Sequence, residues 1–259
     1  MTDGEGDEDM LEVKNLKICY TSTLAVDDVS MEVAKGETLG LVGKSGSGKS
    51  SIAWAIMGMI EHMGGECTGE IYFQGISLLN QPNIYSSILW KKIAIVPQAA
   101  MNSFNPVMKI GCSIREVLKY HWPELSSEER RIRCKELTDS VQLSEEVLLY
   151  YPHQMSGGMK QRAALAKALA CKPELLILDE ATTGLDVLTE ANLLKVVRKI
   201  QREENMSIML ISHDMRLVRS LCDSKVVLRD GKKVADTDRY VKELLDDSYW
   251  MLSKGESVC

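Results

Sequence analysis

The sequence has no apolar run close to the roughly 20 residues that a membrane-spanning helix needs. It also lacks a signal-peptide pattern, because residues 1–9 are acidic and glycine-bearing. The 7 cysteines include no C-x-x-C pair, and the 4 histidines have no metal-ligand spacing. We therefore expect a cytoplasmic protein with reduced thiols, without a disulfide framework or a metal cage.

The sequence also lacks the positive charge that general affinity for nucleic acid would require. The formal net charge is −6. Residues 128–141 carry three arginines, but interleaved Glu and Asp residues favour a solvated helix face over a nucleic-acid patch. Ser126 and Glu129 have the spacing of a capping box at the start of that helix. With 259 residues, the chain can bury a sizeable core.

A glycine loop is the most informative feature that is present. Residues 43–50 match G-x-x-x-x-G-K-[S/T], after an apolar run at 38–42 and before a helical pattern at 52–57. In this strand–loop–helix context the backbone N–H groups wrap an anion, Lys49 reaches the β- and γ-phosphates, and Ser50 binds Mg²⁺. The pattern predicts a nucleoside triphosphate site rather than a glycine-rich turn without a ligand. The candidate phosphate-binding residues are Gly43, Lys44, Ser45, Gly46, Ser47, Gly48, Lys49, Ser50 and Ser51.

A second segment indicates hydrolysis. Residues 175–178 form a continuous apolar run that ends in Asp179 and Glu180, as expected for a buried strand of a parallel sheet. Ligands bind at the carboxyl ends of such strands. Asp179 can hold Mg²⁺ through water, and Glu180 can orient or deprotonate the attacking water. The alternative is a core strand whose acidic end is merely solvated. The presence of the glycine loop makes this alternative less favoured.

The segment upstream of that strand resembles a family signature. Residues 151–162 read YPHQMSGGMKQR and resemble the signature motif of the ATP-binding cassette (ABC) ATPases. Ser156, Gly157 and Gly158 open a helix expected over residues 160–170, where a hydroxyl and bare amides form a second anion site. The resemblance implies that these residues, with Met159, complete the ATP pocket of a second cassette, so that two chains enclose two nucleotides.

Further residues match the family pattern in the expected order along the chain, and the resemblance extends from about residue 11 to 245. Tyr20, 23 positions before Gly43 (43 − 20), matches the aromatic residue that stacks on adenine. Gln98 matches the glutamine that ligates Mg²⁺ and links the two subdomains. Asp186 matches the loop that crosses the dimer interface, and His213 matches the histidine that contacts the γ-phosphate.

Met159 stands where many ABC signatures have Gln. This pattern resembles the branch that serves oligopeptide, dipeptide and nickel importers, and so do residues 102–106 and 151–152. Oligopeptide members of this branch often continue well past the length of this chain, so the chain is similar to the short nickel-type members.

The resemblance implies an α/β fold: a P-loop NTPase core with a mostly parallel sheet, an N-terminal antiparallel β subdomain and an inserted helical subdomain at about 99–172. We expect residues 1–10 to be disordered and residues 11–250 to form a single ABC domain. It implies an ATPase that uses ATP and Mg²⁺ and powers import of peptides, nickel or a related small solute. The implied partners are a second cassette, identical or different, multi-span permease subunits and a solute-binding protein, at the inner face of the cell membrane.

One alternative from another class stays open. A soluble ABC ATPase that remodels an enzyme complex, such as a phosphonate-metabolism cassette, has the same motifs. Tandem ABC proteins of translation or chromosomes fit less well, since the chain has one cassette and no long coiled coil. A small-molecule kinase fits least, because it would not need the Ser-Gly-Gly segment at 156–158 or His213.

Overall fold

The computed structural model describes residues 9–79, 81, 84, 87–98 and 103–246. Most of the expected acidic segment (residues 1–8), part of the branch motif (Asn102) and residues 247–250 lie outside these ranges. The chain forms two compact units, residues 1–86 with 207–259 and residues 87–206. The domain boundaries expected from the sequence stay predictions.

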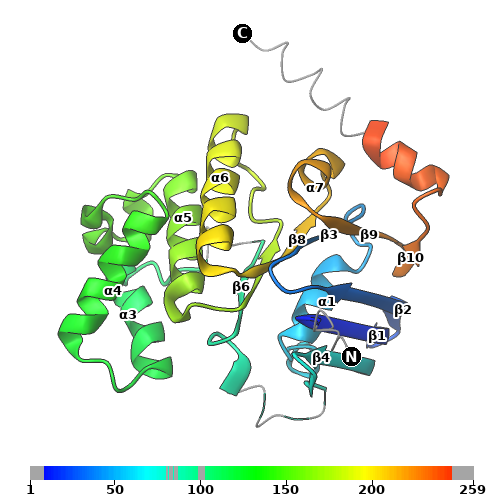
Figure 1. The fold of residues 1–259 in the computed structure, drawn as a ribbon, viewed down its shortest axis with the longest axis horizontal. Coiled ribbons are helices and arrows are strands. Elements are labelled where there is room, and N and C mark those ends of the chain that lie inside the picture. Colours follow the sequence, from blue (N-terminus) through cyan, green and yellow to red (C-terminus); the bar gives the residue numbers. More distant parts are fainter. Residues whose placement is uncertain (1–8, 80, 82–83, 85–86, 99–102, 247–259) are drawn as a thin grey trace, which may run out of the picture. The chain divides into compact units, whose positions relative to one another are not determined.

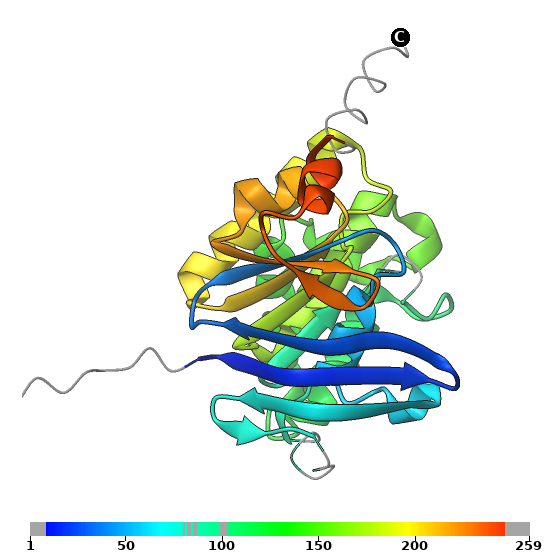
Figure 2. The same ribbon diagram turned by 90° about the vertical axis from the view of Figure 1, so that its right-hand side faces the viewer.

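An antiparallel sheet in the first unit has the order β2-β1-β4-β5, and its long strands lie side by side (Figure 2). The strands are β1 (Leu11–Tyr20), β2 (Thr23–Val33), β4 (Gly65–Phe73) and β5 (Ile76–Ser77). β1 is continuous over ten residues but is not regular. Its register shifts between Val13 and Leu16, where Asn15 has φ 49° and donates its N–H to Ser30 Oγ at 2.9 Å. This bulge keeps Val13 and Leu16 both buried.

The first unit also contains the strand that precedes the glycine loop. This strand, β3 (Thr38–Val42), pairs in parallel with β8 (Ser207–Ser212) and with β9 (Ser224–Arg229). Every residue of β3 and β8 is buried, which confirms the interpretation of such runs as strands covered on both faces. Asp230 and Gly231 form the turn between β9 and antiparallel β10 (Lys232–Val234), and an Asp-Gly pair is typical of such a hairpin. Helical segments of this unit are α1 (Lys49–Ile56), η1 (Glu61–Met63), α7 (Met215–Leu221) and residues 239–246.

In the second unit, β6 (Ile93–Val96) pairs in parallel with β7 (Leu175–Asp179). Helices α3, α4 and α5 lie together in this unit (Figure 1). Its helical segments are α3 (Ile110–His121), α4 (Ser127–Ser140), η3 (Glu145–Leu149), η4 (Pro152–Gln154), α5 (Gly157–Ala168), η5 (Leu169–Cys171) and α6 (Val187–Glu204). The predicted capping box of α4 is confirmed: Ser126 Oγ accepts from Glu129 N at 3.2 Å, and Ser126 N donates to Glu129 Oε2 at 2.7 Å.

These elements confirm the predicted fold class, an α/β fold with an antiparallel N-terminal sheet and mostly parallel strands elsewhere. Within the described ranges, no helix combines the length and apolarity that crossing a membrane requires. The six cysteines that the structure describes are all free thiols. Burial raises the pKa of the Cys67 and Cys134 thiols to about 11, which disfavours reactive thiolates at these two positions.

Candidate functional site

The glycine loop lies in the first unit, between the end of β3 and the start of α1. Gly48 is the N-cap of α1 with φ 96°, and Lys49 is the first helical residue. The Lys49 side chain is buried, and its Nζ donates to the carbonyl oxygens of Gly43 at 2.7 Å and Lys44 at 2.9 Å. The loop therefore combines a held ammonium group with the N–H groups that open a helix, a combination suited to a phosphate chain.

Two of the loop glycines are required by close backbone packing. A Cβ at Gly43 would lie 2.3 Å from the Leu228 carbonyl oxygen, and one at Gly48 would lie 2.5 Å from the Ala25 carbonyl oxygen. Any side chain at either position would displace the loop from β9 or β2. The fixed spacing of these glycines in the motif thus has a steric reason in this chain.

Tyr20 and His213 also belong to the first unit. Tyr20 ends β1 and pairs with Gly65, where an added Cβ would lie 2.8 Å from Tyr20 Cδ1. The ring therefore rests against a glycine backbone. His213 follows β8 directly and is exposed. Both residues lie at strand ends, while their contacts with nucleotide stay predictions.

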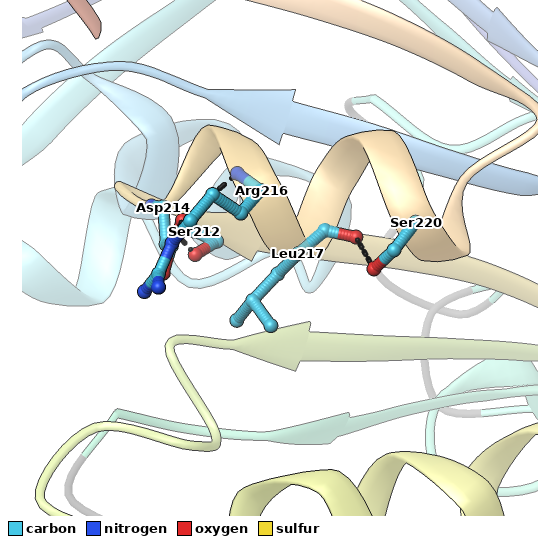
Figure 3. Close-up of polar contacts among 5 residues, drawn as sticks. All are labelled: Ser212, Asp214, Arg216, Leu217 and Ser220. Atoms are coloured by element: carbon cyan, nitrogen blue, oxygen red, sulfur yellow. Dashed lines mark hydrogen bonds and ion pairs between the residues drawn. The ribbon is translucent and has the colours of Figure 1, made fainter. Parts of the chain in front are cut away.

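The turn that follows β8 is fixed by hydrogen bonds among Ser212, Asp214 and Arg216 (Figure 3). Asp214 caps α7 by accepting from Arg216 N at 2.8 Å, and it also accepts from Arg216 Nε at 3.0 Å. Asp214 N donates to Ser212 Oγ at 2.9 Å. Burial acts to raise the pKa of Asp214, but the hydrogen bonds and charge of Arg216 outweigh it and hold this pKa below its usual value.

Two predicted catalytic residues come together in the second unit. Gln98 and Glu180 each lie two residues beyond the paired Val96 and Leu178 at the ends of β6 and β7. Gln98 Nε2 donates to Glu180 Oε2 at 2.7 Å, and Thr183 Oγ1 donates to the same oxygen at 3.4 Å. Glu180 is 9% exposed and has φ 47°. The hydrogen bonds therefore fix a nearly buried carboxylate that can orient a water molecule or accept its proton.

The signature residues line a cavity of ≈ 430 Å³ in the second unit together with Asp186. Ser156 is the N-cap of α5, and its Oγ accepts from Met159 N at 3.3 Å. Asp186 caps α6 by accepting from Thr189 Oγ1 at 2.6 Å and Thr189 N at 3.0 Å, and these bonds lower its pKa. The predicted signature and the predicted dimer loop are therefore neighbours. The cavity is lined by Gln142, Leu143, Ser156, Gly157, Gly158, Met159, Arg162, Gly184, Leu185, Asp186 and Thr189.

The predicted Mg²⁺ ligands are chemically suitable. Ser50, Gln98 and Asp179 offer hydroxyl, amide and carboxylate oxygens, which are the hard donors that Mg²⁺ prefers. Asp179 ends β7 and is 2% exposed. Ser50 belongs to the first unit, and Gln98 and Asp179 belong to the second. The described part of the chain contains no cluster of three or more His, Cys, Asp or Glu residues that could hold a metal ion.

Several residues that support these sites were not predicted from the sequence. The capping role of Asp214 could have been predicted from the sequence, because an Asp directly before a helical run is a common N-cap. The sequence gives a weaker indication of the contact between Thr183 and Glu180, since Thr183 lies three positions after Glu180 in a turn. Tyr240, whose hydroxyl accepts from Lys44 N at 2.9 Å, is 196 positions away from its partner. No local pattern indicates that contact.

Three features define the class of nucleoside-triphosphatase cassettes. They are the glycine loop that opens α1, the carboxylates at the end of β7 and the Ser-Gly-Gly start of α5. The chain belongs to the ABC transporter family, whose family model, described as "ABC transporter", matches residues 26–183. It is an ABC ATPase, which hydrolyses ATP to ADP and phosphate.

Relatives and solved structures agree with this assignment. The chain is 38% identical over 230 residues to the oligopeptide transport ATP-binding protein OppD of Haemophilus influenzae, covering 86% of this chain and 71% of that protein. It is 40% identical over 233 residues to the oligopeptide transport ATP-binding protein AppD of Bacillus subtilis, covering 87% and 71%. The dimeric structure of MJ0796, a bacterial ABC transporter cassette, matches with a TM-score of 0.77, 27% identity and coverage of 87% and 97%. A second dimeric structure of MJ0796 is a post-hydrolysis state bound to ADP and Pi.

Proposed function

We propose that this chain powers the import of a peptide, or of a related small solute, through a membrane permease. The observation that carries the proposal is the 38–40% identity, over 86–87% of the chain, to proteins named for oligopeptide transport. Met159 in the signature is consistent with the same branch. Import of nickel stays a prediction from the sequence, because the two relatives described above are named for oligopeptides.

In this proposal the first unit binds the nucleotide. The loop amides of residues 43–51 and the Lys49 ammonium hold the triphosphate, and Tyr20 stacks on adenine. His213 contacts the γ-phosphate. Ser50, Gln98 and Asp179 would hold Mg²⁺, Asp179 through water, and the ion would neutralise phosphate charge.

Glu180 acts on the attacking water in this mechanism. Its carboxylate, held by Gln98 at 2.7 Å, orients the water and accepts its proton. The water oxygen forms a bond to the γ-phosphorus while the bond from that phosphorus to the β–γ bridging oxygen breaks, and ADP leaves with the bridging oxygen and its electron pair. A base that is already oriented needs no reorganisation when the reaction occurs.

A second cassette completes each site in this proposal. Its Ser156, Gly157, Gly158 and Met159 cover the nucleotide, and Asp186 lies in the loop that crosses the interface. Nucleotide binds the closed pair better than the open one, so binding and hydrolysis shift a two-state equilibrium that can drive a permease. The MJ0796 cassette, which is dimeric in both solved structures, supports this arrangement. The partner cassette can be identical or a different chain.

The remaining partners are multi-span permease subunits and a solute-binding protein, which place this chain at the cytoplasmic face of the membrane. The test is capture of the Glu180→Gln full chain with ATP from its native cells, with Lys49→Ala as the control that cannot retain nucleotide. Recovery of polytopic membrane chains with Glu180→Gln alone is the expected result. Recovery of soluble metabolic enzymes instead would contradict import and favour the alternative of a soluble remodelling ATPase.

A further inference from the structure

A tyrosine near the C-terminal end of the described chain contacts the glycine loop directly. The Tyr240 hydroxyl accepts a hydrogen bond of 2.9 Å from the backbone N–H of Lys44, the second residue of the loop. Tyr240 is 5% exposed, and the bond that it makes with the exposed Lys44 is partly buried. A loop amide is thereby paired with a side chain from a helical segment 196 positions away.

The position of the Tyr240 hydroxyl is fixed by the packing of its ring. Tyr240, Val241 and Leu244 form a buried cluster with Val42, which ends β3, and with Val227 of β9. The neighbouring residues of the ring include two cations. The Arg229 guanidinium lies 5.2 Å and the Lys44 ammonium 6.0 Å from the ring centre, distances at which cation–π attraction acts.

Steric contact with β9 also restricts the start of the glycine loop. Gly43 approaches the Leu228 carbonyl so closely that an added Cβ would lie 2.3 Å from that oxygen. Steric contact with β9 and the hydrogen bond from Lys44 N therefore act on adjacent residues. Together they restrict the first turn of the loop before any ligand binds, and a restricted site loses less entropy on binding.

We propose that Tyr240 is a positioning residue for nucleotide binding, which fixes the start of the glycine loop through its hydroxyl group. The inference rests on the proposed role of residues 43–51 in phosphate binding. It makes the helical segment 239–246 part of the nucleotide site, although that segment contacts the loop from outside the motif.

The direct test is Tyr240→Phe in the full chain, which removes the hydroxyl and keeps the ring. The dissociation constant for MgATP should rise by about two- to tenfold, the effect of losing one ordinary hydrogen bond. The rate at saturating ATP should stay unchanged, and the thermal unfolding midpoint without nucleotide should fall by about 2–4 °C at most, because the lost hydrogen bond belongs to the folded protein. The matched control is Tyr72→Phe, on β4 of the antiparallel sheet, which should change none of these quantities.

Lys49→Ala distinguishes a failure of the Tyr240 inference from a failure of the glycine-loop assignment. If Lys49→Ala abolishes MgATP binding and Tyr240→Phe leaves it unchanged, the positioning role of Tyr240 is wrong while the loop assignment holds. If Lys49→Ala leaves binding unchanged, the loop assignment fails and takes this inference with it. Amide hydrogen exchange of the wild-type protein adds a test that needs no variant: the Lys44 N–H should exchange more slowly than the N–H of exposed Ser45. Equal rates would contradict the contact.

Discussion

Gln98 donates a 2.7 Å hydrogen bond to the Glu180 carboxylate, and both residues lie two positions past paired residues of β6 and β7. Parallel pairing therefore delivers an amide and a carboxylate to the same strand ends. Together with the 3.4 Å hydrogen bond from Thr183 Oγ1, this bond gives the carboxylate a defined orientation.

Removing this donor should slow hydrolysis more than it weakens binding. Gln98→Ala should lower kcat for ATP by about ten- to 100-fold, since a hydrogen bond to a charged group contributes about 1.5–3 kcal/mol. The measurement is phosphate release at saturating MgATP, with Gln201→Ala on α6 as the matched control. A kcat equal to that of the control would show that Gln98 does not orient the base.

Lys49→Ala should weaken MgATP binding by about 100-fold or more, because it removes a buried, charge-assisted donor from the loop. Titration with a fluorescent ATP analogue gives the affinity. Lys35→Ala, at an exposed turn residue outside the loop, removes the same charge and should leave affinity unchanged. Unchanged affinity in Lys49→Ala would refute the assignment of the loop.

Gly158→Ala should destabilise the protein, because the new Cβ would lie 2.7 Å from Thr189 Cγ2. Overpacking of this kind costs about 1–3 kcal/mol of unfolding free energy. Thr189→Ser removes that methyl group and keeps a hydroxyl for Asp186. The double variant should therefore recover most of the loss in denaturant unfolding. If the two effects simply add, the close approach of α5 and α6 is not the cause.

The Asp214–Arg216 pair should make stability depend on pH. The folded-state pKa of Asp214 is lowered from its usual 3.8, so the stability that this carboxylate contributes is complete above about pH 4. It is lost as the pH falls through the lower, folded-state pKa. Arg216→Leu should remove up to about 1 kcal/mol of unfolding free energy at pH 7, the upper range for a partly exposed ion pair.

The matched control for that pair is Arg219→Leu, which removes the same charge from an exposed position of α7. Denaturant unfolding of wild type and both variants from pH 7 to pH 3 gives the comparison. The difference between wild type and Arg216→Leu should shrink as the solution becomes acidic, while Arg219→Leu follows wild type throughout. A difference that stays constant with pH would exclude the carboxylate of Asp214 as its source.

Local patterns predicted much of the fold. The apolar runs of β3, β7 and β8, the capping box at Ser126 and the Asp230–Gly231 hairpin all depend on residues close together in sequence. Such signals act within one turn or one strand, so the sequence is sufficient to identify them. The fold class and the ATPase family follow from the same motifs.

The start of α5 shows where local propensity misleads. The sequence predicted a helix from residue 160, whereas α5 begins at Gly157. Glycine is a poor helix former, but the Ser156 side chain accepts from Met159 N and stabilises the first turn. The cap therefore outweighs the propensity of the two glycines that follow it.

Contacts between distant residues were not predictable from one sequence. Gln98 and Glu180 are 82 positions apart, and Lys44 and Tyr240 are 196 positions apart. Only the pairing of β6 with β7, and the packing of residues 239–246 on β3 and β9, brings these side chains together. A motif identifies which residues act, but tertiary packing determines which residues hold them in place.

Glu180→Gln tests the central claim, hydrolysis of ATP by the Glu180 carboxylate, most directly. The variant keeps the shape of the side chain and loses the base, so MgATP binding should persist. Phosphate release should fall by about 100- to 10,000-fold, the usual contribution of a general base. Light scattering with ATP should then detect a trapped dimer that wild type forms only transiently. Wild-type turnover in Glu180→Gln would contradict the account, because another group would then have to activate the water.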